Sequence, residues 1–421
     1  MKRLYFYLSV LSLFFLFSCK AKQKDADGNL PDEKTFYEID LSHDFKGSQC
    51  DNLLLSDIVE GVEYVQLETT DDCLIDGGCY VALTDKDIYV LNNSSTNVKL
   101  FRFDRSTGKF ITPIGQTGQG PQDMLRPTVL YAEDDLVYAA SNIANKVYAY
   151  HKNGEYVRAV SMGRGTGQRI TVIQDKYIIR HSGHDFMRSD NNYVEGNPRL
   201  YFAAKILDMD GNTLYAKCDT LPGEETSVTI DWDPRRWYYK GELNFYNEVD
   251  NTVYTVNEKG VTPRYKFNLG KNRWEVTGKI TKEYLGYIKF HQFKETADYL
   301  YIFWNQYQKP YFARFDKKNE KLDVQEQVPY EKGRFWHIFA PGPLNDIDGC
   351  GINFSPSDGN YEDKAGSFVF IITPDNIDRA REALEKSENV KFPEKRQQLL
   401  KLLDSRQEDD NPILAIYKLK N

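Results

Sequence analysis

Two segments of this 421-residue chain place aromatic rings beside groups that can carry charge. The first contains Trp232, Arg235, Arg236 and Trp237, and the second is Trp336 with His337. Flat aromatic rings stack on sugar faces or on peptide side chains, and arginine adds planar hydrogen bonding. These residues are the first candidate ligand-binding surface. The alternative is that the rings fill gaps between structural units.

A second kind of candidate is rich in oxygen or imidazole. Asp346 and Asp348 lie in an Asn-Asp-Ile-Asp-Gly segment, which could hold a cation or contact a substrate. The further ligands of an EF-type calcium loop are missing, and Asx turns explain the same composition without a metal. His181 and His184 are weak metal candidates because the sequence names no third ligand. We therefore expect no bound metal or cofactor.

The familiar catalytic motifs are absent from the sequence: it has no Gly-x-Ser-x-Gly elbow, no HExxH and no Walker-type loop. The glycines between 115 and 120 lack both a following helix and a Lys-Ser/Thr pair, so we expect a connector rather than a phosphate-binding loop. Acidic residues number 62, and spacing alone does not show which of them meet in the fold. The sequence therefore leaves open whether the chain is an enzyme.

The elements that position these residues follow from a repeat. The strand at 88–91, the strand at 100–104 and the turn at Gly108 recur at 137–140, 147–151 and Gly154, an offset of 49 residues at the first strand. This is the period of a propeller blade. Later turns fall at Gly211, Gly260 and Asn319, and asparagine also tolerates a left-handed turn. The sequence predicts an all-β fold, a six-bladed β-propeller, with seven blades as the alternative.

Segments from both ends of the chain are expected to close the propeller ring. Residues 61–67 and 412–419 predict an N-terminal and a C-terminal strand, and 367–372 predict a strand of the sixth blade. Between the strands at 367–372 and 412–419 lies a helical stretch, in which Thr373-Pro374 begins the first helix and Pro393 the second. We expect a helical hairpin, at about 374–408, inserted in the last blade and lying outside the ring. The propeller itself is expected to span 34–421.

The N-terminus predicts export. Lys2 and Arg3 precede an apolar run that is too short to span a bilayer, and the run ends at Leu16-Phe17-Ser18-Cys19. This ending resembles a bacterial lipobox, which predicts a signal peptide at 1–18, lipidation at Cys19 and a flexible tether at 19–33. The basic residues directly after Cys19 favour an outer-membrane lipoprotein on the periplasmic face over one on the cell surface. The membrane is thus an expected partner, reached through the lipid.

Charge and cysteine content restrict the partners further. Loss of Lys2 and Arg3 with the signal peptide changes the formal charge from −8 to −10, which argues against nucleic-acid binding. Five cysteines follow Cys19, so at least one does not pair within the chain. Cys73 and Cys79 flank a glycine turn and either form a disulfide or act as small buried residues.

Four segments resemble a family of lipoproteins from Bacteroides-type bacteria: six-bladed, NHL-like β-propellers of uncharacterised function. They begin at Val65, Phe103, Ile114 and Leu344, and the ending from Asn411 to Lys420 fits as well. The resemblance implies a propeller and a lipid anchor but no activity. Rigid blades that present variable loops suit recognition. We therefore expect a binding module for a glycan, a peptide or an envelope protein, and the alternative is a hydrolase or lyase acting on a glycan or peptide at the central channel.

Overall fold

The structure is a computed structural model, and it describes the chain in segments. These are residues 35–50, 53–75, 78–94, 98–141, 143–162, 170–173, 175–181, 193–194, 197–220, 235–248, 250–258, 260–273, 286–327, 342–350, 361–363, 366–387, 389–407 and 409–420. Residues Phe36–Asn421 form one compact unit. The signal peptide, Cys19 and the tether that the sequence predicts lie outside the described residues.

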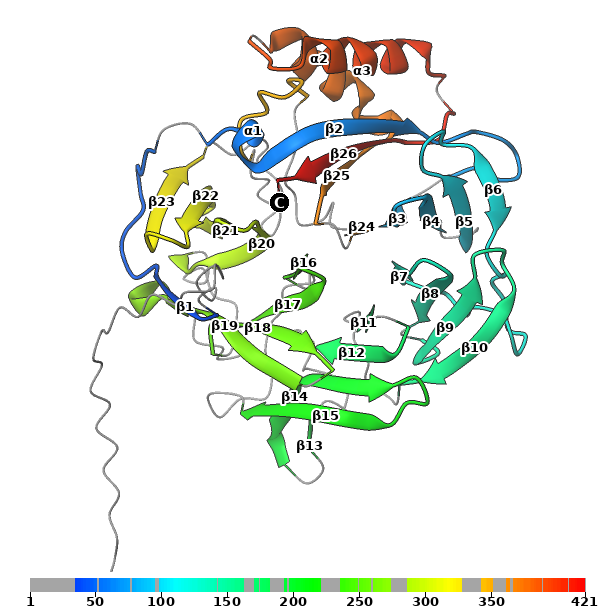
Figure 1. The fold of residues 1–421 in the computed structure, drawn as a ribbon, viewed down its shortest axis with the longest axis horizontal. Helices are drawn as coiled ribbons and strands as arrows, with labels where there is room; N and C mark the ends of the chain where they lie inside the picture. The colour runs from blue at the N-terminus through cyan, green and yellow to red at the C-terminus, as the bar shows by residue number, and fades with distance from the viewer. Residues whose placement is uncertain are drawn as a thin grey trace, which may run out of the picture. The chain divides into compact units, whose positions relative to one another are not determined.

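The described strands of this unit form six sheets placed around a common centre, which confirms the six-bladed propeller (Figure 1). Blades 1 and 2 consist of β3 (Cys79–Leu83), β4 (Asp87–Asn93), β5 (Val98–Asp104) and β6 (Phe110–Pro113), then β7 (Val129–Ala132), β8 (Leu136–Ser141), β9 (Lys146–His151) and β10 (Tyr156–Ser161). Blade 3 consists of β11 (Ile170–Ile173), β12 (Tyr177–His181), β14 (Asn197–Asp208) and β15 (Thr213–Thr220), with the short β13 (Tyr193–Val194) beside β14.

The second half of the ring continues the same order from the inner strand outward. Blade 4 consists of β16 (Arg236–Tyr239), β17 (Glu242–Asn247), β18 (Thr252–Asn257) and β19 (Gly260–Asn268), and blade 5 of β20 (Lys289–Glu295), β21 (Tyr299–Gln306), β22 (Lys309–Asp316) and β23 (Lys321–Glu326). Blade 6 joins both ends of the chain: β25 (Phe368–Ile372), β26 (Ile413–Leu419) and the N-terminal β2 (Val59–Gln66).

Ring closure follows the sequence-based expectation. Strand β2 pairs antiparallel with β26 from Val59 to Gln66, so the N-terminal strand is the outer strand of blade 6. A second closure lies at the centre, where β24 (Tyr361–Asp363) pairs parallel with β3 of blade 1. Strand β26 therefore lies between β2 and β25, and both of its edges are paired.

The N-terminal segment also crosses the neighbouring blades. Strand β1 (Tyr37–Asp40) adds to the outer edge of blade 4, parallel to β19. The chain then passes blade 5, where the backbone N–H of Glu326 donates to the carbonyl of Ser48 at 2.9 Å. It next forms the short helix α1 (Leu55–Ile58), which leads directly into β2. This segment thus connects blades 4, 5 and 6 along their outer edges.

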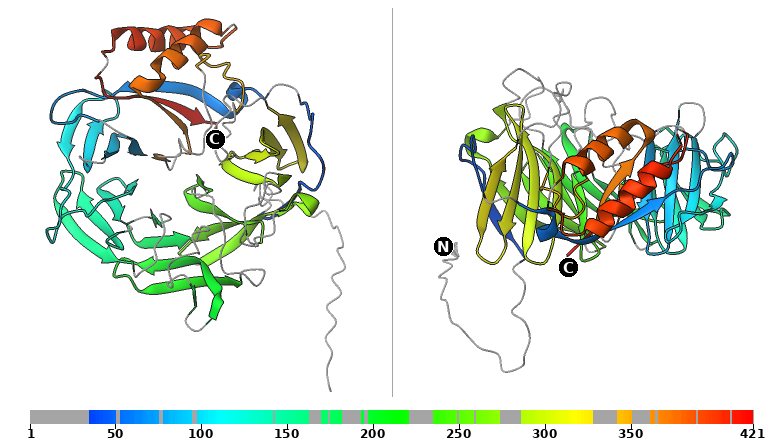
Figure 2. Two further views of the ribbon diagram at one scale, coloured as in Figure 1. Left: turned by 180° about the vertical axis from the view of Figure 1, so that it is seen from behind. Right: turned by 90° about the horizontal axis from the view of Figure 1, so that it is seen from above.

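The helical hairpin is confirmed between β25 and β26, outside the ring (Figure 2). A 3-10 turn at Pro374–Asn376 leads into α2 (Ile377–Lys386), and Pro393 opens α3 (Pro393–Ser405), where its missing N–H costs no helical hydrogen bond. Leucines four residues apart, Leu399 and Leu403, face the blade and are buried. No helix in the described part of the chain is long and apolar enough to cross a membrane.

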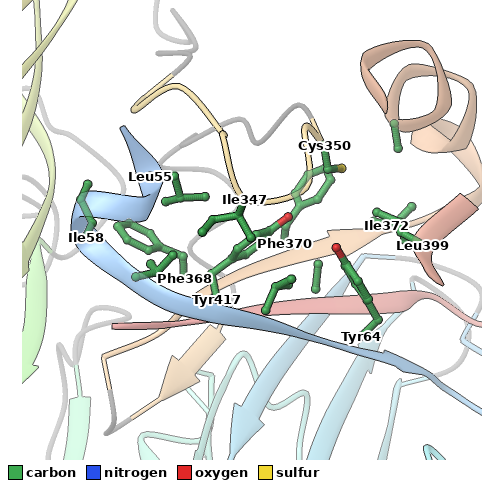
Figure 3. Packing of buried hydrophobic residues seen from close by; sticks show 14 of the residues in the cluster. Leu55, Ile58, Tyr64, Ile347, Cys350, Phe368, Phe370, Ile372, Leu399 and Tyr417 are labelled. Atoms are coloured by element: carbon green, nitrogen blue, oxygen red, sulfur yellow. The ribbon is translucent and has the colours of Figure 1, made fainter. Parts of the chain in front are cut away.

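Buried side chains fill the spaces between neighbouring blades. The cluster that joins blades 5 and 6 to the hairpin includes Tyr64, Phe370, Cys350, Leu399 and Tyr417 (Figure 3). Strand periodicity produces it: alternate residues of β2, β25 and β26 point to the helical side, and the others point towards blade 1.

The turn between the two outer strands of a blade contains a residue with positive φ, and in blade 5 this residue is not the predicted one. Gly108 has φ +71°, and a Cβ there would lie 1.9 Å from the backbone oxygen of Gln66, so only glycine fits. In blade 5 the left-handed residue is Glu320, φ 53°, and not Asn319 as predicted. Glu320 lies four residues after Asp316, just as Gly108 lies four after Asp104. Asn319 instead donates through its side chain to Asp316 at 2.8 Å.

The glycine-rich segment near 115 is a connector between blades 1 and 2, as predicted. It follows β6 and precedes β7, and its polar groups gather around Asp123. The backbone N–H of Gly120 and the side-chain amide of Gln116 donate to that carboxylate at 2.8 and 2.7 Å. These two donors therefore bind a carboxylate of the same loop.

The described cysteines Cys50, Cys73, Cys79 and Cys350 carry no disulfide. Cys73 and Cys79 are both buried in the cluster between blades 6 and 1, which is the second of the two alternatives that the sequence leaves open.

Candidate functional site

The inner strands of blades 2, 3 and 4 bring polar side chains together near the centre of the ring. Tyr131 comes from β7, Thr171 from β11, and Arg236 and Tyr238 from β16. The guanidinium carbon of Arg236 lies 5.9 Å from the ring centroid of Tyr131, two blades away. We call these four residues the central polar cluster.

Strand alternation explains why β16 contributes two members of this cluster. The strand reads Arg-Trp-Tyr-Tyr, so Arg236 and Tyr238 share one face and Trp237 takes the other. Tyr238 packs with residues of blade 3, whereas Trp237 packs against blade 5. The same alternation thus separates the two residues, Arg236 and Trp237, that the sequence analysis grouped into one surface.

The hydroxyl groups of the cluster are buried. Tyr131 is 3% exposed, Thr171 0% and Tyr238 7%. Within the described part of the chain, neither the hydroxyl of Tyr131 nor that of Thr171 forms a hydrogen bond of normal length and angle. A buried hydroxyl without such a bond is costly, because it has lost its water and gained no full replacement. The pair therefore favours a further partner at this position.

Raised pKa values keep the two tyrosine hydroxyl groups protonated, and therefore able to donate, at neutral pH. Burial raises the pKa of Tyr131 above 10, although Arg236 and the hydroxyl of Thr171 act in the opposite direction. Burial also raises the pKa of Tyr238, with smaller contributions from Tyr131 and Glu133. Thr171 affects the pKa of both tyrosines, which places its hydroxyl near each of them. The cluster thus offers three neutral hydroxyl groups and one cation.

Trp237 belongs to a separate, fully buried cluster between blades 4 and 5. Its ring stacks on Phe293 with centroids 4.8 Å apart, and its Nε1 donates to Glu295 at 3.0 Å. The same carboxylate accepts from Tyr265 at 2.7 Å and pairs with Arg264 and Lys317. Because the indole is 4% exposed and both its face and its N–H are occupied, it offers no stacking surface in this conformation.

Arg235 also lies away from the central polar cluster. It is 8% exposed, pairs with Glu248 at 3.3 Å and lies over the ring of Tyr246, with 5.8 Å to the centroid. These contacts hold the start of β16 to the end of β17. Of the three described candidates in this segment, Arg235, Arg236 and Trp237, the structure thus places Arg236 at the centre.

Asp348 is held entirely by protein donors. Tyr64 and Tyr417 both donate to its Oδ2, and Asn345 and the backbone N–H of Cys350 donate to its Oδ1 at 2.7 and 2.9 Å. The last bond and the donation of Ile347 N–H to Asn345 are the Asx-turn contacts that the sequence analysis gave as the alternative. The carboxylate joins this loop to β2 and β26.

Asp346 makes a second connection from the same loop. Its two oxygens accept from the backbone N–H and the hydroxyl of Ser56, at 2.8 and 2.6 Å, and Lys391 lies 3.2 Å away. Ser56 belongs to α1, and Lys391 lies between α2 and α3. The loop therefore fastens both elements to blade 6, and we do not assign either aspartate to the ligand site.

The other predicted candidates fall outside the described residues: Trp232, Trp336, His337 and His184. The backbone of His181 ends β12, but its side chain is not described. Among the described residues, no group of three or more His, Cys, Asp or Glu could hold a metal ion.

Sequence reasoning missed Tyr131, Thr171 and the buried Glu295, whereas Tyr238 lies in the aromatic segment that it singled out. Tyr131 and Thr171 lie in short apolar strands, Val-Leu-Tyr-Ala and Ile-Thr-Val-Ile, with no motif around them. The sequence signal that could have identified Tyr131 and Thr171 was a polar side chain within the innermost strand of a predicted blade.

The comparisons with known proteins agree with this architecture. The sequence family described as "Domain of unknown function (DUF4934)" matches residues 36–418. A search of curated proteins finds no match.

Among solved structures, one from Bacteroides fragilis, described provisionally as an exported protein, has a TM-score of 0.57 at 16% identity. The alignment covers 92% of this chain and 100% of that one. A DUF4221 member from Bacteroides vulgatus has a TM-score of 0.42 at 10% identity, covering 86% of this chain and 98% of that one. AztD from Citrobacter koseri has a TM-score of 0.38 at 8% identity, covering 69% and 76%. The first of these similarities supports the fold.

Proposed function

Since this chain belongs to the family described as domain of unknown function DUF4934, whose description names no activity, we propose a function from its own structure. The protein is a binding module of the cell envelope that recognises a ligand at the centre of its six-bladed ring. The ligand is a glycan, a peptide or a segment of an envelope protein.

One observation carries this proposal: two buried hydroxyl groups, on Tyr131 and Thr171, lie together with Arg236 and lack normal hydrogen bonds to the described residues. Three different blades supply these groups, so the rigid ring fixes their spacing. A ligand that enters the centre gains hydrogen bonds without first ordering a loop, which lowers the cost of binding.

The envelope location rests on two further observations. The sequence has a lipobox-like Leu16-Phe17-Ser18-Cys19 after a short apolar run. The Bacteroides fragilis protein of similar fold is described as exported. Together they support export and a lipid anchor on Cys19, and the basic residues directly after Cys19 favour the periplasmic side of the outer membrane.

Binding of the purified full-length chain to a panel of glycans and peptides tests the proposal. We expect at least one panel member to bind, and Tyr131→Phe and Thr171→Val each to weaken it by about three- to tenfold, the effect of one neutral hydrogen bond. Tyr156→Phe on β10, an outer strand, is the matched control and should leave the affinity unchanged.

Two results would count against this function. The first is binding that neither Tyr131→Phe nor Thr171→Val affects, because the ligand then lies elsewhere. The second is conversion of a panel member into products, measured by mass spectrometry, which would instead support the hydrolase or lyase alternative.

A further inference from the structure

Resting on the proposed binding function, we infer that the ligand at the centre is an extended peptide that pairs with the inner edge of blade 1. Strand β24 occupies this edge as a segment of the chain itself. The peptide displaces β24, which therefore acts as an internal competitor for the site.

Strand β24 shows that the inner edge of blade 1 accepts an extended backbone. It adds to β3 on the side of the ring centre (Figure 1). The pairing is parallel, with Tyr361 opposite Val81 and Asp363 opposite Leu83. Proteins bind extended peptides in the same way, by adding them to a sheet edge through main-chain hydrogen bonds.

Strand β24 is an addition to the propeller repeat and not a part of it. Strands β3, β4, β5 and β6 pair antiparallel in chain order, whereas β24 comes from the far end of the sequence and pairs parallel. Among the strands that the structure describes, the innermost strands of blades 2 to 5 carry no such addition. Release of β24 therefore leaves the four strands of blade 1 paired with one another.

The pairing of β24 is short, as a comparison with β1 shows. Strand β1 also adds in parallel to a blade, but it buries Tyr37 and Ile39 and continues into Leu41, whose N–H donates to Asn268 at 2.8 Å and whose carbonyl accepts from Asn272 at 2.7 Å. Strand β24 has three residues, and parallel pairing is slightly less stable per residue than antiparallel pairing. A peptide of similar length at high concentration can therefore replace it.

The position of β24 connects this edge with the candidate site. Strand β24 contacts β7, the innermost strand of blade 2, which carries Tyr131. The hydroxyl groups of Tyr131 and Thr171 are buried without a normal hydrogen bond, and the carbonyl groups of a peptide would offer them acceptors. A glycan lacks the alternating N–H and C=O groups with which a sheet edge pairs, so a peptide is favoured.

The test uses a fluorescein-labelled peptide that copies residues 359–366, Gly-Asn-Tyr-Glu-Asp-Lys-Ala-Gly. Its binding to the full chain is measured by fluorescence anisotropy. In the proline pair, Glu362→Pro with Asp363→Pro, β24 loses two N–H donors and should leave the edge of β3. The alanine pair, Glu362→Ala with Asp363→Ala, is the matched control, because it changes the same side chains and keeps both N–H groups.

We expect the proline pair to bind the labelled peptide at least about tenfold more tightly than the native chain, because removal of an internal competitor raises the fraction of molecules that can bind. The alanine pair should stay within about threefold of the native chain. A labelled peptide with prolines in place of its glutamate and aspartate should bind the proline pair at least about tenfold more weakly. Circular dichroism and a thermal melt establish that each variant is folded.

Hydrogen–deuterium exchange of the native chain gives the answer even if the proline pair does not fold. With the labelled peptide at millimolar concentration, the amides of residues 361–363 of the chain should exchange faster, while those of β3 keep their protection because one partner replaces another. Unchanged or slower exchange at 361–363 would overturn the inference.

The remaining outcomes separate the inference from the function. The inference is wrong if the proline pair binds the labelled peptide no more tightly than the alanine pair, or does not bind it at millimolar concentration. If a glycan of the panel binds instead and Tyr131→Phe weakens it, the peptide inference is wrong and the central site stands. If no panel member responds to Tyr131→Phe, to Thr171→Val or to the proline pair, the proposed function is wrong as well.

Discussion

Replacing Glu295 by glutamine should destabilise the protein more than any surface substitution. The side chain of Glu295 is completely buried and lies between two cations, Arg264 and Lys317. It also accepts from Trp237 and Tyr265 at 3.0 and 2.7 Å. Glutamine keeps the shape and one oxygen but removes the charge that neutralises the cations.

The magnitude follows from the burial of the partners. Lys317 is 4% exposed in its side chain and Arg264 12%, so water replaces little of the lost interaction. Removing one partner of a buried ion pair costs about 3–5 kcal/mol. Because glutamine can still accept from Trp237 or Tyr265, we expect the lower end, about 3 kcal/mol.

Urea unfolding followed by tryptophan fluorescence measures this loss. With a slope of about 3 kcal/mol per M, the midpoint of Glu295→Gln should fall by about 1 M at an unchanged slope. Glu155→Gln, at an exposed turn of blade 2, is the control and should stay within about 0.5 kcal/mol of the native chain.

A second substitution examines the cause. Lys317→Met removes one of the two cations, so Glu295→Gln combined with Lys317→Met should be more stable than the sum of the single effects by about 1 kcal/mol or more. The reasoning is refuted if Glu295→Gln lies within about 0.5 kcal/mol of the native protein, or if the two effects simply add.

Three further predictions concern the turns, the loop contacts and the thiols. Gly108→Ala, at φ +71°, should lose at least about 2 kcal/mol in urea unfolding, whereas Gly61→Ala, with open space around it, should change little; equal losses would contradict the steric reason. Burial acts to raise the pKa of Asp346, but hydrogen bonds from Ser56 outweigh it and hold the pKa below 3.8, so the stabilisation is present above pH 3.8 and is lost as the pH falls through the folded-state pKa. Asp346→Asn should therefore be less stable at pH 7 and approach the native chain in strong acid, and a gap that does not narrow in acid argues against this linkage. Burial raises the pKa of Cys79 to about 11, so iodoacetamide at pH 8 should label it only after denaturation, and mass spectrometry showing rapid labelling of the folded chain would overturn this.

Much of the fold was predictable because its signals are local. The order of strand, strand and glycine turn recurs along the sequence, and the prolines at 374 and 393 mark the start of helical segments. The pairing of β2 with β26 is a contact between distant segments, yet it follows from the requirement that a ring leave no open edge. Asn319 shows the limit: residue type suggested the left-handed position, but the backbone of the turn places it at Glu320.

The candidate site was less predictable, because a residue belongs to the central polar cluster only if its side of the strand points to the centre of the ring. Arg235, Arg236 and Trp237 are consecutive, yet they contact Glu248, Tyr131 and Glu295 respectively, on three different sides. Asp346 and Asp348 were recognisable as an oxygen-rich loop, whereas their partners on α1, β2 and β26 are far away in sequence. Such long-range partners leave no mark in a single sequence.

Hydrogen–deuterium exchange with and without the tightest-binding member of the glycan and peptide panel tests the central claim most directly. If the ligand binds at the centre of the ring, protection at long exchange times should be greatest in the inner strands β7, β11 and β16. Protection confined to the outer strands or to α2 and α3 would contradict a binding site at the centre.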